Sequence, residues 1–196
     1  MAAFVTQPAP QFTAKAYSNG EFRDISLSEF KGKKVVLFFY PLDFTFVCPT
    51  EILAFSDTID EFKKRNTEVL GVSVDSHFTH QAWAGTPREE GGIKGVTFPL
   101  VSDLNKNIAR DYGVLLEGAG IALRGLFIIN KDGILKHITV NHLDLGRDID
   151  EVLRVVDAIE FSETHGEVCP ANWKKGGKAM KPDASSLKEY VKSQGK

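Results

Sequence analysis

The residues best able to do chemistry in this sequence lie around one cysteine, Cys48. Pro49 follows it directly, and proline favours the first turn of a helix, where its missing N–H has no partner to lose. Free backbone N–H groups and the positive end of a helix dipole stabilise negative charge, which favours the thiolate, the reactive form of cysteine. Thr45, three residues earlier, offers a hydroxyl that can donate to the sulfur or to a bound oxygen atom. This pattern predicts a nucleophilic cysteine at the start of a helix.

The elements on either side of Cys48 can be read from their side chains. Residues 35–40 form a short apolar run rich in β-branched and aromatic residues, which indicates a buried central strand. Pro41 cannot donate a backbone hydrogen bond, so the strand ends there. Residues 50–65 repeat apolar side chains at helical spacing, and Glu51 supplies a first-turn carboxylate that suits the helix dipole. This context favours a reactive role, although a lone cysteine is more often a small buried hydrophobic residue.

Strand and helix patterns alternate along the rest of the chain, which is typical of an α/β protein with a mixed sheet. Asn19-Gly20 predicts a tight hairpin near the N-terminus. Ser76 or Asp75 is suited to cap a helix over 77–85. The other predicted elements are strands at 12–16, 21–25, 69–74, 98–101, 125–129 and 134–140, a hairpin turn at 130–133, and helices at 105–112, 148–161 and 185–192.

Length and composition place the chain among ordinary globular proteins. It has 196 residues, 42% hydrophobic and 26% charged, which suits one domain with a substantial core. A net charge of -2 offers no broad basic field for nucleic acid, and no apolar stretch approaches the length of a membrane span. The first residues lack the basic and apolar segments of a secretory signal, so we expect a reducing, cytoplasmic setting. Two cysteines do not make a disulfide scaffold, and in such a setting a disulfide is usually catalytic.

The segment around Cys48 resembles that of a known family, the peroxiredoxins. Pro41, Thr45 and Cys48 match the family signature Pro-x-x-x-Thr-x-x-Cys. The longer stretch 39–51 looks like that of the typical 2-Cys subgroup, which includes alkyl hydroperoxide reductase C and the thiol-specific antioxidant proteins. A match of this length is far more specific than a lone cysteine beside a proline.

A second resemblance lies far from the first. Gly-Glu-Val-Cys-Pro at 166–170 matches the segment that carries the resolving cysteine of the typical 2-Cys subgroup, here Cys169. The resemblance covers nearly the whole chain and implies a thioredoxin-like fold, with a mixed central sheet flanked by helices. On this basis we expect a peroxiredoxin domain at 1–161 and a C-terminal tail at 162–196, whose glycines, prolines and polar residues indicate mobility.

The resemblance implies a thiol peroxidase that needs no cofactor and no metal. In that family a thiolate at the position of Cys48 attacks hydrogen peroxide or an alkyl hydroperoxide and becomes sulfenic acid. Cys169 of a partner subunit would then form a disulfide with it. A thioredoxin-type or flavoprotein disulfide reductase would restore both thiols by exchange.

Further site residues follow from the same resemblance. Arg124 stands in Arg-Gly-Leu-Phe-Ile, where the family carries an arginine that completes the active site. A guanidinium there would favour the thiolate of Cys48 and hold a peroxide oxygen. Glu51 and Arg147 match positions that form supporting polar contacts, and Pro41 belongs to the signature itself.

The resemblance also implies a homodimer, a ring of five dimers and a secondary holdase chaperone activity. Family members build the contact between dimers at positions that correspond to Asp43, Phe44, Thr45 and Trp83.

The chain departs from its over-oxidation-sensitive relatives in two places. Those relatives carry Gly-Gly-Leu-Gly and a C-terminal Tyr-Phe. Here the matching stretches are Gly-Gly-Ile-Lys, which ends at Lys94, and Tyr-Val, which ends at Val191. Because part of each motif remains, we expect intermediate resistance to over-oxidation.

Other classes of function fit the sequence less well. A thioredoxin-type disulfide oxidoreductase needs Cys-x-x-Cys at the helix start, but Thr45 holds the first cysteine position here. His77 and His80 lie three apart on one predicted helix without an evident third ligand, and His165 lies four before Cys169. Structural zinc takes four closed ligands, so we expect no metal site. A purely structural holdase remains a non-enzymatic alternative.

Overall fold

The computed structural model describes residues 3–194. The described chain forms two compact units that divide between Ile149 and Asp150. The sequence had predicted a boundary at 161/162, but a helix that starts at Ile149 runs through that position, to His165. No helix within residues 3–194 has both the length and the apolar character needed to cross a membrane.

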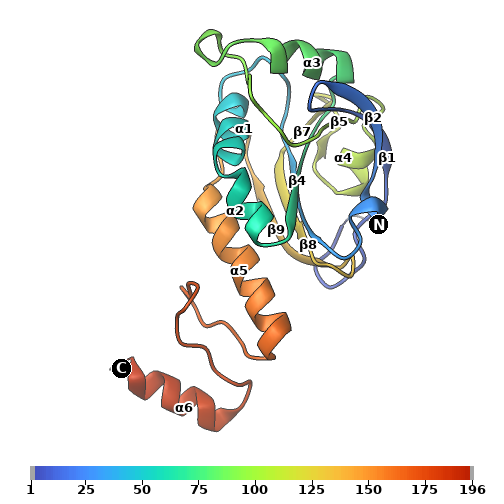
Figure 1. Ribbon diagram of the computed structural model, residues 1–196. Coiled ribbons are helices and arrows are strands. Elements are labelled where there is room, and N and C mark those ends of the chain that lie inside the picture. Colours follow the sequence, from blue (N-terminus) through green and yellow to red (C-terminus); the bar gives the residue numbers. More distant parts are fainter. Residues whose placement is uncertain (1–2, 195–196) are drawn as a thin grey trace. The chain divides into compact units, whose positions relative to one another are not determined.

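A seven-stranded sheet in the order β2-β1-β5-β4-β3-β8-β9 forms the centre of the first unit (Figure 1). Its central strands β3, β4 and β5 are parallel, and the strands beside them pair antiparallel. The sheet is therefore mixed, as the sequence predicted. Its strands are β1 (Thr13–Ser18), β2 (Glu21–Ser26), β3 (Lys34–Phe39), β4 (Thr67–Ser73), β5 (Leu100–Ser102), β8 (Arg124–Ile129) and β9 (Leu135–Asn141); β6 (Leu115–Leu116) and β7 (Ile121–Ala122) form a separate pair.

Helices cover both faces of this sheet (Figure 1). Phe38 of β3 stacks on Phe55 of α1, with ring centroids 4.5 Å apart, whereas its neighbour Phe39 contacts Tyr112 just after α4 on the opposite face. Successive side chains of a strand point to opposite faces, so α1 and α4 lie on opposite sides of the sheet. The helical segments are α1 (Cys48–Asp57), α2 (Ile59–Lys64), α3 (His77–Gly85), α4 (Asn107–Asp111), α5 (Ile149–His165) and α6 (Ala184–Ser193), with short 3-10 turns at Leu27–Phe30 and Arg88–Glu90.

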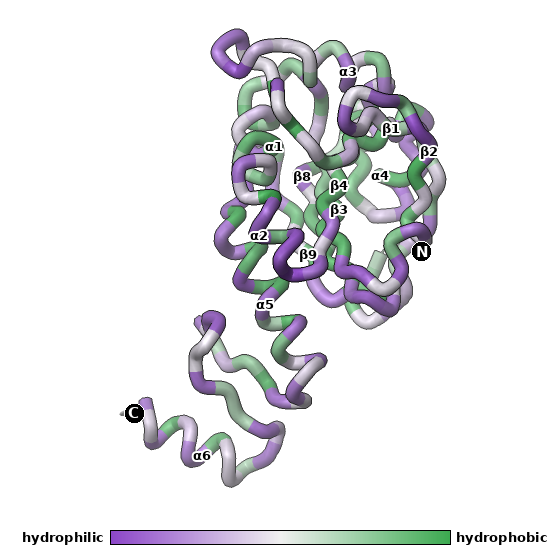
Figure 2. Tube along the Cα trace, viewed as in Figure 1, coloured by the Kyte–Doolittle hydropathy of each residue, from purple (hydrophilic) through white to green (hydrophobic). Residues whose placement is uncertain are grey.

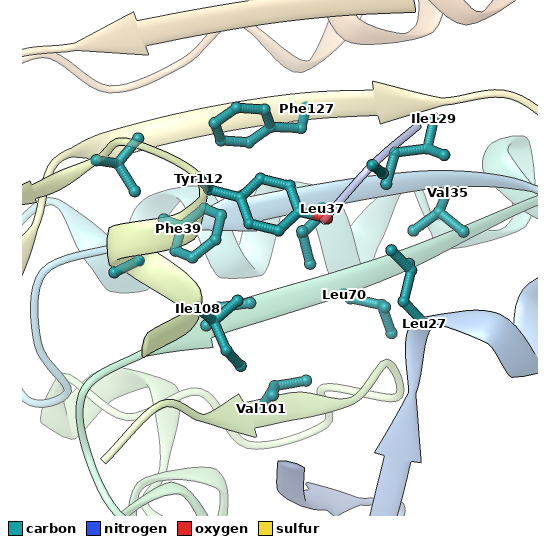
Figure 3. Packing of buried hydrophobic residues seen from close by; sticks show 14 of the residues in the cluster. Leu27, Val35, Leu37, Phe39, Leu70, Val101, Ile108, Tyr112, Phe127 and Ile129 are labelled. Atoms are coloured by element: carbon teal, nitrogen blue, oxygen red, sulfur yellow. The ribbon is translucent and has the colours of Figure 1, made fainter. Parts of the chain in front are cut away.

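The hydrophobic core lies against β3, whose residues are all buried. A strand covered on both faces reads as a continuous apolar run, which is why residues 35–40 show no alternation. On one face Phe39, Tyr112 and Phe127 meet in edge and tilted ring contacts, surrounded by aliphatic side chains from β4 and β8 (Figure 3). Figure 2 shows the same concentration of hydrophobic residues along the strands of the first unit.

Two local predictions are confirmed by backbone geometry. Asn19 and Gly20 have φ angles of +50° and +91°, the left-handed values that a tight hairpin turn with the natural strand twist requires. Ser76, not Asp75, caps α3, because its side chain accepts a hydrogen bond from the backbone N–H of Thr79.

The single helix predicted over 50–65 is instead two helices, α1 and α2, separated at Thr58. The hydroxyl of Thr58 donates to the carbonyl of Ala54 over 2.6 Å, and the backbone at Thr58 has a ψ of 8°, outside helical values. A threonine hydroxyl that bonds the carbonyl four residues earlier competes with the helical hydrogen bond and bends the chain. Apolar spacing continues across this break, so periodicity alone could not reveal it.

The second unit contains most of α5, an extended connection and α6 (Figure 1). Val168 and Met180 form an isolated antiparallel bridge within the connection, which brings the segment around Cys169 back upon itself. α6 begins after Asp183, whose carboxylate accepts from the backbone N–H of Ser186, close to the predicted start at 185.

Candidate active site

Cys48 is the first residue of α1, which confirms its predicted place at a helix start. Val47 is the N-cap and Pro49 stands in the first turn. Pro41 is buried and lies two residues after Phe39, the last residue of β3. The Cys48 side chain is fully buried and its thiol is free. A free, buried thiol in the first helical turn lies where the helix dipole favours negative charge.

Arg124 brings a cation to this sulfur. Its Nη1 donates to the Sγ of Cys48 over 3.4 Å and to Oε2 of Glu51 over 2.6 Å. Its Nε donates to the carbonyl of Leu143, which fixes the plane of the guanidinium. Arg124 is the first residue of β8, and β8 runs antiparallel to β3. The start of β8 therefore lies beside the end of β3, and this pairing joins residues far apart in the sequence.

Arg147 completes a buried cluster around Glu51. Arg147 Nε donates to Glu51 Oε1 over 2.7 Å, and its Nη2 donates to Oε2 over 2.9 Å. Its Nη1 donates to the carbonyls of Phe39 and Gly125, each over 2.8 Å, which ties the cluster to β3 and β8. Burial lowers the pKa of the Arg147 guanidinium, and the charge of Glu51 opposes that change. Arginine nevertheless stays protonated in proteins.

The charges in this cluster do not balance without the thiolate. Two guanidinium groups, from Arg124 and Arg147, face one carboxylate, from Glu51, and all three side chains are at most 4% exposed. Buried charge is costly unless an opposite charge compensates it. A negative sulfur on Cys48, in contact with Arg124, supplies that compensation. The arrangement thus favours the nucleophilic form of the thiol.

The Thr45 hydroxyl has a different hydrogen-bond partner from the one that the sequence predicted. Its hydroxyl donates to the carbonyl of Leu42 over 2.9 Å rather than to the sulfur of Cys48. Because the hydroxyl proton is engaged there, the oxygen offers its lone pairs to an incoming O–H group. Thr45 in this structure is suited to accept a hydrogen bond from a substrate, and at the same time it stabilises the loop before Cys48.

Sequence reasoning missed a buried polar network under the same loop. Asp43 is hydrogen-bonded through Oδ2 to Nδ1 of His80 over 2.7 Å, and it accepts from the hydroxyl of Tyr40 over 2.9 Å. Its backbone N–H donates to Asp75. Burial raises the pKa of the Asp43 carboxyl, and the hydrogen bond with His80 opposes this. These contacts hold the loop after β3 in place, and only the acidic type of Asp43 in an otherwise apolar stretch hinted at them.

The remaining histidines and Trp83 have structural partners. His77 makes edge contacts with Phe22, and His80 pairs with Asp43, so these two do not converge. Within residues 3–194 no group of His, Cys, Asp and Glu side chains is arranged to hold a metal ion. Trp83 is fully buried and donates through Nε1 to the carbonyl of Gly91. Phe44, in contrast, is 53% exposed and has a φ of +53°.

Cys169 lies in the second unit and is also a free thiol. It is partly buried, and its Sγ lies 3.7 Å from the carbonyl oxygen of Ala158 in α5. Burial raises the pKa of the Cys169 thiol, and the nearby guanidinium of Arg154 opposes that rise. The two cysteines thus have different surroundings: Cys48 contacts a guanidinium within a positive cluster, and Cys169 rests against a helix backbone.

Comparison with known proteins places this geometry in a family. The AhpC/TSA family matches residues 5–138, and the C-terminal domain of 1-Cys peroxiredoxin matches residues 158–193. Peroxiredoxin-1 of Gallus gallus is 58% identical over 193 residues, which cover 98% of this chain and 97% of the relative. The mitochondrial thioredoxin-dependent peroxide reductase of Homo sapiens is 60% identical over 186 residues, or 95% of this chain and 73% of the relative.

Solved structures agree with this result. The reduced 2-Cys peroxiredoxin of Plasmodium vivax superposes with a TM-score of 0.94 at 46% identity, covering 97% of this chain and 99% of that one. The thioredoxin-like fold inferred from the resemblance is thereby confirmed. On its sequence, its fold and the family matches, the chain belongs to the AhpC/TSA family as a 2-Cys peroxiredoxin, a thiol peroxidase of the oxidoreductase class.

Proposed function

We propose that this peroxiredoxin reduces hydrogen peroxide and alkyl hydroperoxides through a sulfenic acid on Cys48, which Cys169 of a partner subunit then resolves. The observation that carries the proposal is the 3.4 Å contact between Arg124 Nη1 and the Cys48 sulfur. That contact lies inside a buried cluster with an excess of positive charge. A thiolate is the nucleophile in cysteine chemistry, and this environment favours it.

In the first step the Cys48 thiolate attacks one peroxide oxygen, and the O–O bond breaks. The sulfur is oxidised to sulfenic acid, the peroxide is reduced, and the leaving oxygen takes up a proton to become water or an alcohol. Negative charge moves from the sulfur to the leaving oxygen during this step. Donors of Arg124 stabilise that charge, while the lone pairs of Thr45 orient the O–H group of the peroxide.

In the second step Cys169 must reach a sulfur that is fully buried. A disulfide requires Cα atoms within about 7 Å and suitable Cβ directions, so the first turn of α1 has to open. That turn is held at its start by backbone bonds from Thr50 and Glu51 to Val47, and Val47 makes no side-chain cap. The helix start lacks a capping side chain, whereas the ion pairs of Glu51 with Arg124 and Arg147 oppose opening, so the turn has to open transiently by local unfolding before the disulfide forms.

Regeneration requires a dithiol reductant. Relatives of this chain carry the name thioredoxin-dependent peroxide reductase, and we extend that dependence to this protein. A thioredoxin-type thiolate would attack the disulfide and restore both thiols through a mixed disulfide. A flavoprotein disulfide reductase is the alternative, and parallel assays with each reductant decide between them.

Exposed aromatic residues support the proposal that dimers assemble into a ring of five. Phe44 and Phe78 are 53% and 62% exposed in the single chain, and large exposed apolar side chains often mark protein contacts. Size-exclusion chromatography with light scattering tests the assembly. Exposed apolar side chains would also suit a holdase, which needs no thiol, so an aggregation assay on Cys48→Ser separates chaperone activity from peroxidase activity.

The decisive experiment follows the thiols during one turnover. After one equivalent of peroxide, wild-type protein should migrate as a disulfide-linked dimer in non-reducing denaturing electrophoresis. Cys169→Ser should instead stay monomeric and hold a sulfenic acid on Cys48, and Cys48→Ser should consume no peroxide. Peroxide consumption by Cys48→Ser would refute the nucleophile, and a monomeric oxidised band with an internal bridge would refute the partner-subunit route.

A further inference from the structure

One face of α5 holds the segment that carries Cys169. Arg154, Ala158 and Phe161 follow one another at spacings of four and three residues, so they share one helix face. Nη1 of Arg154 donates to the carbonyl of Trp173 over 2.9 Å, and the rings of Phe161 and Trp173 lie 5.0 Å apart. The Sγ of Cys169 rests against the carbonyl of Ala158 in the same helix. The thiol therefore lies about one helical turn from the Arg154 position.

The guanidinium of Arg154 is held in a fixed orientation. Nε and Nη2 donate to the two carboxylate oxygens of Glu151, over 2.6 and 2.8 Å, in a bidentate pair. Bidentate pairing fixes the plane of an arginine side chain better than a single contact does. With two of its nitrogens on Glu151, the third reaches Trp173 and so anchors the chain just beyond Cys169.

We propose that Arg154 is a positioning residue of the resolving step, which anchors the Cys169 segment on α5 and favours the thiolate of Cys169. The proposal rests on the proposed function, in which Cys169 resolves the sulfenic acid. Arg154 has no part in the cluster of Arg124, Glu51 and Arg147, which acts on Cys48.

The chemistry of the second step explains why a cation helps. The Cys169 thiol loses its proton, and its thiolate attacks the sulfenic sulfur of Cys48. The new S–S bond forms as the S–O bond breaks, and the departing hydroxide takes up a proton to become water. The sulfenic sulfur is reduced and the Cys169 sulfur is oxidised, so no further reagent is needed. Only the thiolate attacks at a useful rate, and the rate follows the thiolate fraction.

Electrostatics around Cys169 agree with this role. Burial raises the pKa of the thiol, and the positive charge of Arg154 counteracts that effect. Two other ionisable groups on α5 have partners of their own: Asp157 pairs with Lys175 over 3.5 Å, and Nδ1 of His165 is hydrogen-bonded to the carbonyl of Phe161. Glu151 neutralises part of the Arg154 charge, which limits the size of the effect.

The test compares Arg154→Gln and Arg154→Lys with wild type. In a Cys48→Ser background, the rate of Cys169 alkylation by iodoacetamide is measured against pH. Arg154→Gln should move the midpoint to higher pH, and Arg154→Lys should restore most of the shift because it keeps the charge. Arg110→Gln is the matched control, since Arg110 forms an equivalent bidentate pair with Glu117 in the other unit and should leave the profile unchanged.

A second readout follows disulfide formation directly. After one equivalent of peroxide, rapid acid quench and non-reducing electrophoresis should show the disulfide forming about three- to fivefold more slowly in Arg154→Gln than in wild type at neutral pH. The difference should shrink at high pH, where the thiol ionises without help.

The two readouts also separate failure of this inference from failure of the proposed function. Equal midpoints and equal rates in wild type and Arg154→Gln would overturn the role of Arg154 while the disulfide still forms. A slowing that is the same at every pH and is not relieved by Arg154→Lys would overturn the electrostatic role of Arg154, because that pattern means loss of the anchoring contact alone. If wild-type protein forms no Cys48–Cys169 disulfide at all, the proposed function fails instead.

Discussion

Arg124, the first residue of β8, directs Nη1 at the sulfur of Cys48, the first residue of α1, across 3.4 Å. The same nitrogen donates to Glu51, so the carboxylate holds the guanidinium in place while it faces the sulfur. The active site therefore lies where the start of β8 meets the end of β3, close to the helix that follows β3.

Replacement of Arg124 should slow the first chemical step. Arg124→Gln keeps a hydrogen-bond donor but loses the positive charge. Removal of one group that stabilises the charge developing in the transition state typically raises the activation free energy by about 2.7–4 kcal/mol, which slows the reaction a hundredfold or more. Rapid-mixing measurement of peroxide consumption in a single turnover checks this. Arg110→Gln serves as the surface control. Oxidation of Cys48 at the wild-type rate in Arg124→Gln would show that the contact does not contribute to catalysis.

Loss of Glu51 should destabilise the protein as well as impair it. Glu51→Gln leaves two buried guanidinium groups without their counter-charge, and breaking a buried pair typically costs about 3–5 kcal/mol. Urea unfolding followed by circular dichroism measures the change in unfolding free energy. Glu61→Gln, which removes an exposed carboxylate that pairs with Lys64, should change stability little. Similar midpoints for the two variants would argue against a charge-balanced cluster.

Thr45 should act through its oxygen rather than its size. Thr45→Val keeps the shape but removes the acceptor that orients the peroxide, and misplaced reactants can cost about a hundredfold in rate, so we expect a loss of up to that size. Thr45→Ser keeps the hydroxyl and should retain most of the rate. Stability is measured in parallel, because Thr45→Val also loses the hydrogen bond to Leu42. Equal rates for the valine and serine variants would mean that the oxygen plays no part.

Disulfide formation should accelerate with rising pH. Burial raises the pKa of the Cys169 thiol above its ordinary value, so at neutral pH the protonated, unreactive form predominates. Below that pKa the thiolate fraction grows about tenfold per pH unit, and the rate of the second step should follow it. Quenched-flow measurement between about pH 6 and about pH 9, a range that brackets the ordinary thiol pKa of about 8.5, tests this. A pH-independent rate would indicate that opening of α1, not thiol ionisation, limits the step.

Over-oxidation of Cys48 should increase when the two positions that differ from the sensitive relatives are given the residues of those relatives. Lys94 stands where those relatives carry a glycine, and Val191, which is 40% exposed, stands where they carry an aromatic ring. We expect a glycine at position 94 and an aromatic ring at position 191 to delay opening of the active-site helix, which would give the sulfenic acid on Cys48 more time to react further. Lys94→Gly combined with Val191→Phe should therefore form more sulfinic acid on Cys48 at rising peroxide, as measured by mass spectrometry.

Either substitution alone should give an intermediate yield of sulfinic acid, because each restores only one of the two features. Lys174→Gly, an exposed lysine change in the C-terminal segment, is a control that should behave as wild type. Equal sulfinic acid yields in the double variant and wild type would show that these positions do not govern over-oxidation in this chain.

Local sequence signals were enough to predict the frame of the active site. The apolar run into Pro41 predicted the buried strand, and Pro49 with Glu51 predicted the helix that begins at Cys48. Such signals work because strand burial and helix capping depend on residues within a few positions of one another. For the same reason the sequence limited the N-cap of α3 to two residues, Ser76 and Asp75, of which Ser76 is the cap in the structure.

The partners of these residues depended on the tertiary structure. Only the family resemblance predicted a cation near the thiol. Residue types and spacing could not, because Arg124 and Cys48 are 76 positions apart and meet only when β8 pairs with β3. The Asp43–His80 pair and the bond from Thr45 to Leu42 likewise had no reliable sequence signal. Hydrogen bonds are short-range and directional, so their partners are decided by which side chains the folded sheet brings within about 3 Å, and not by spacing along the chain.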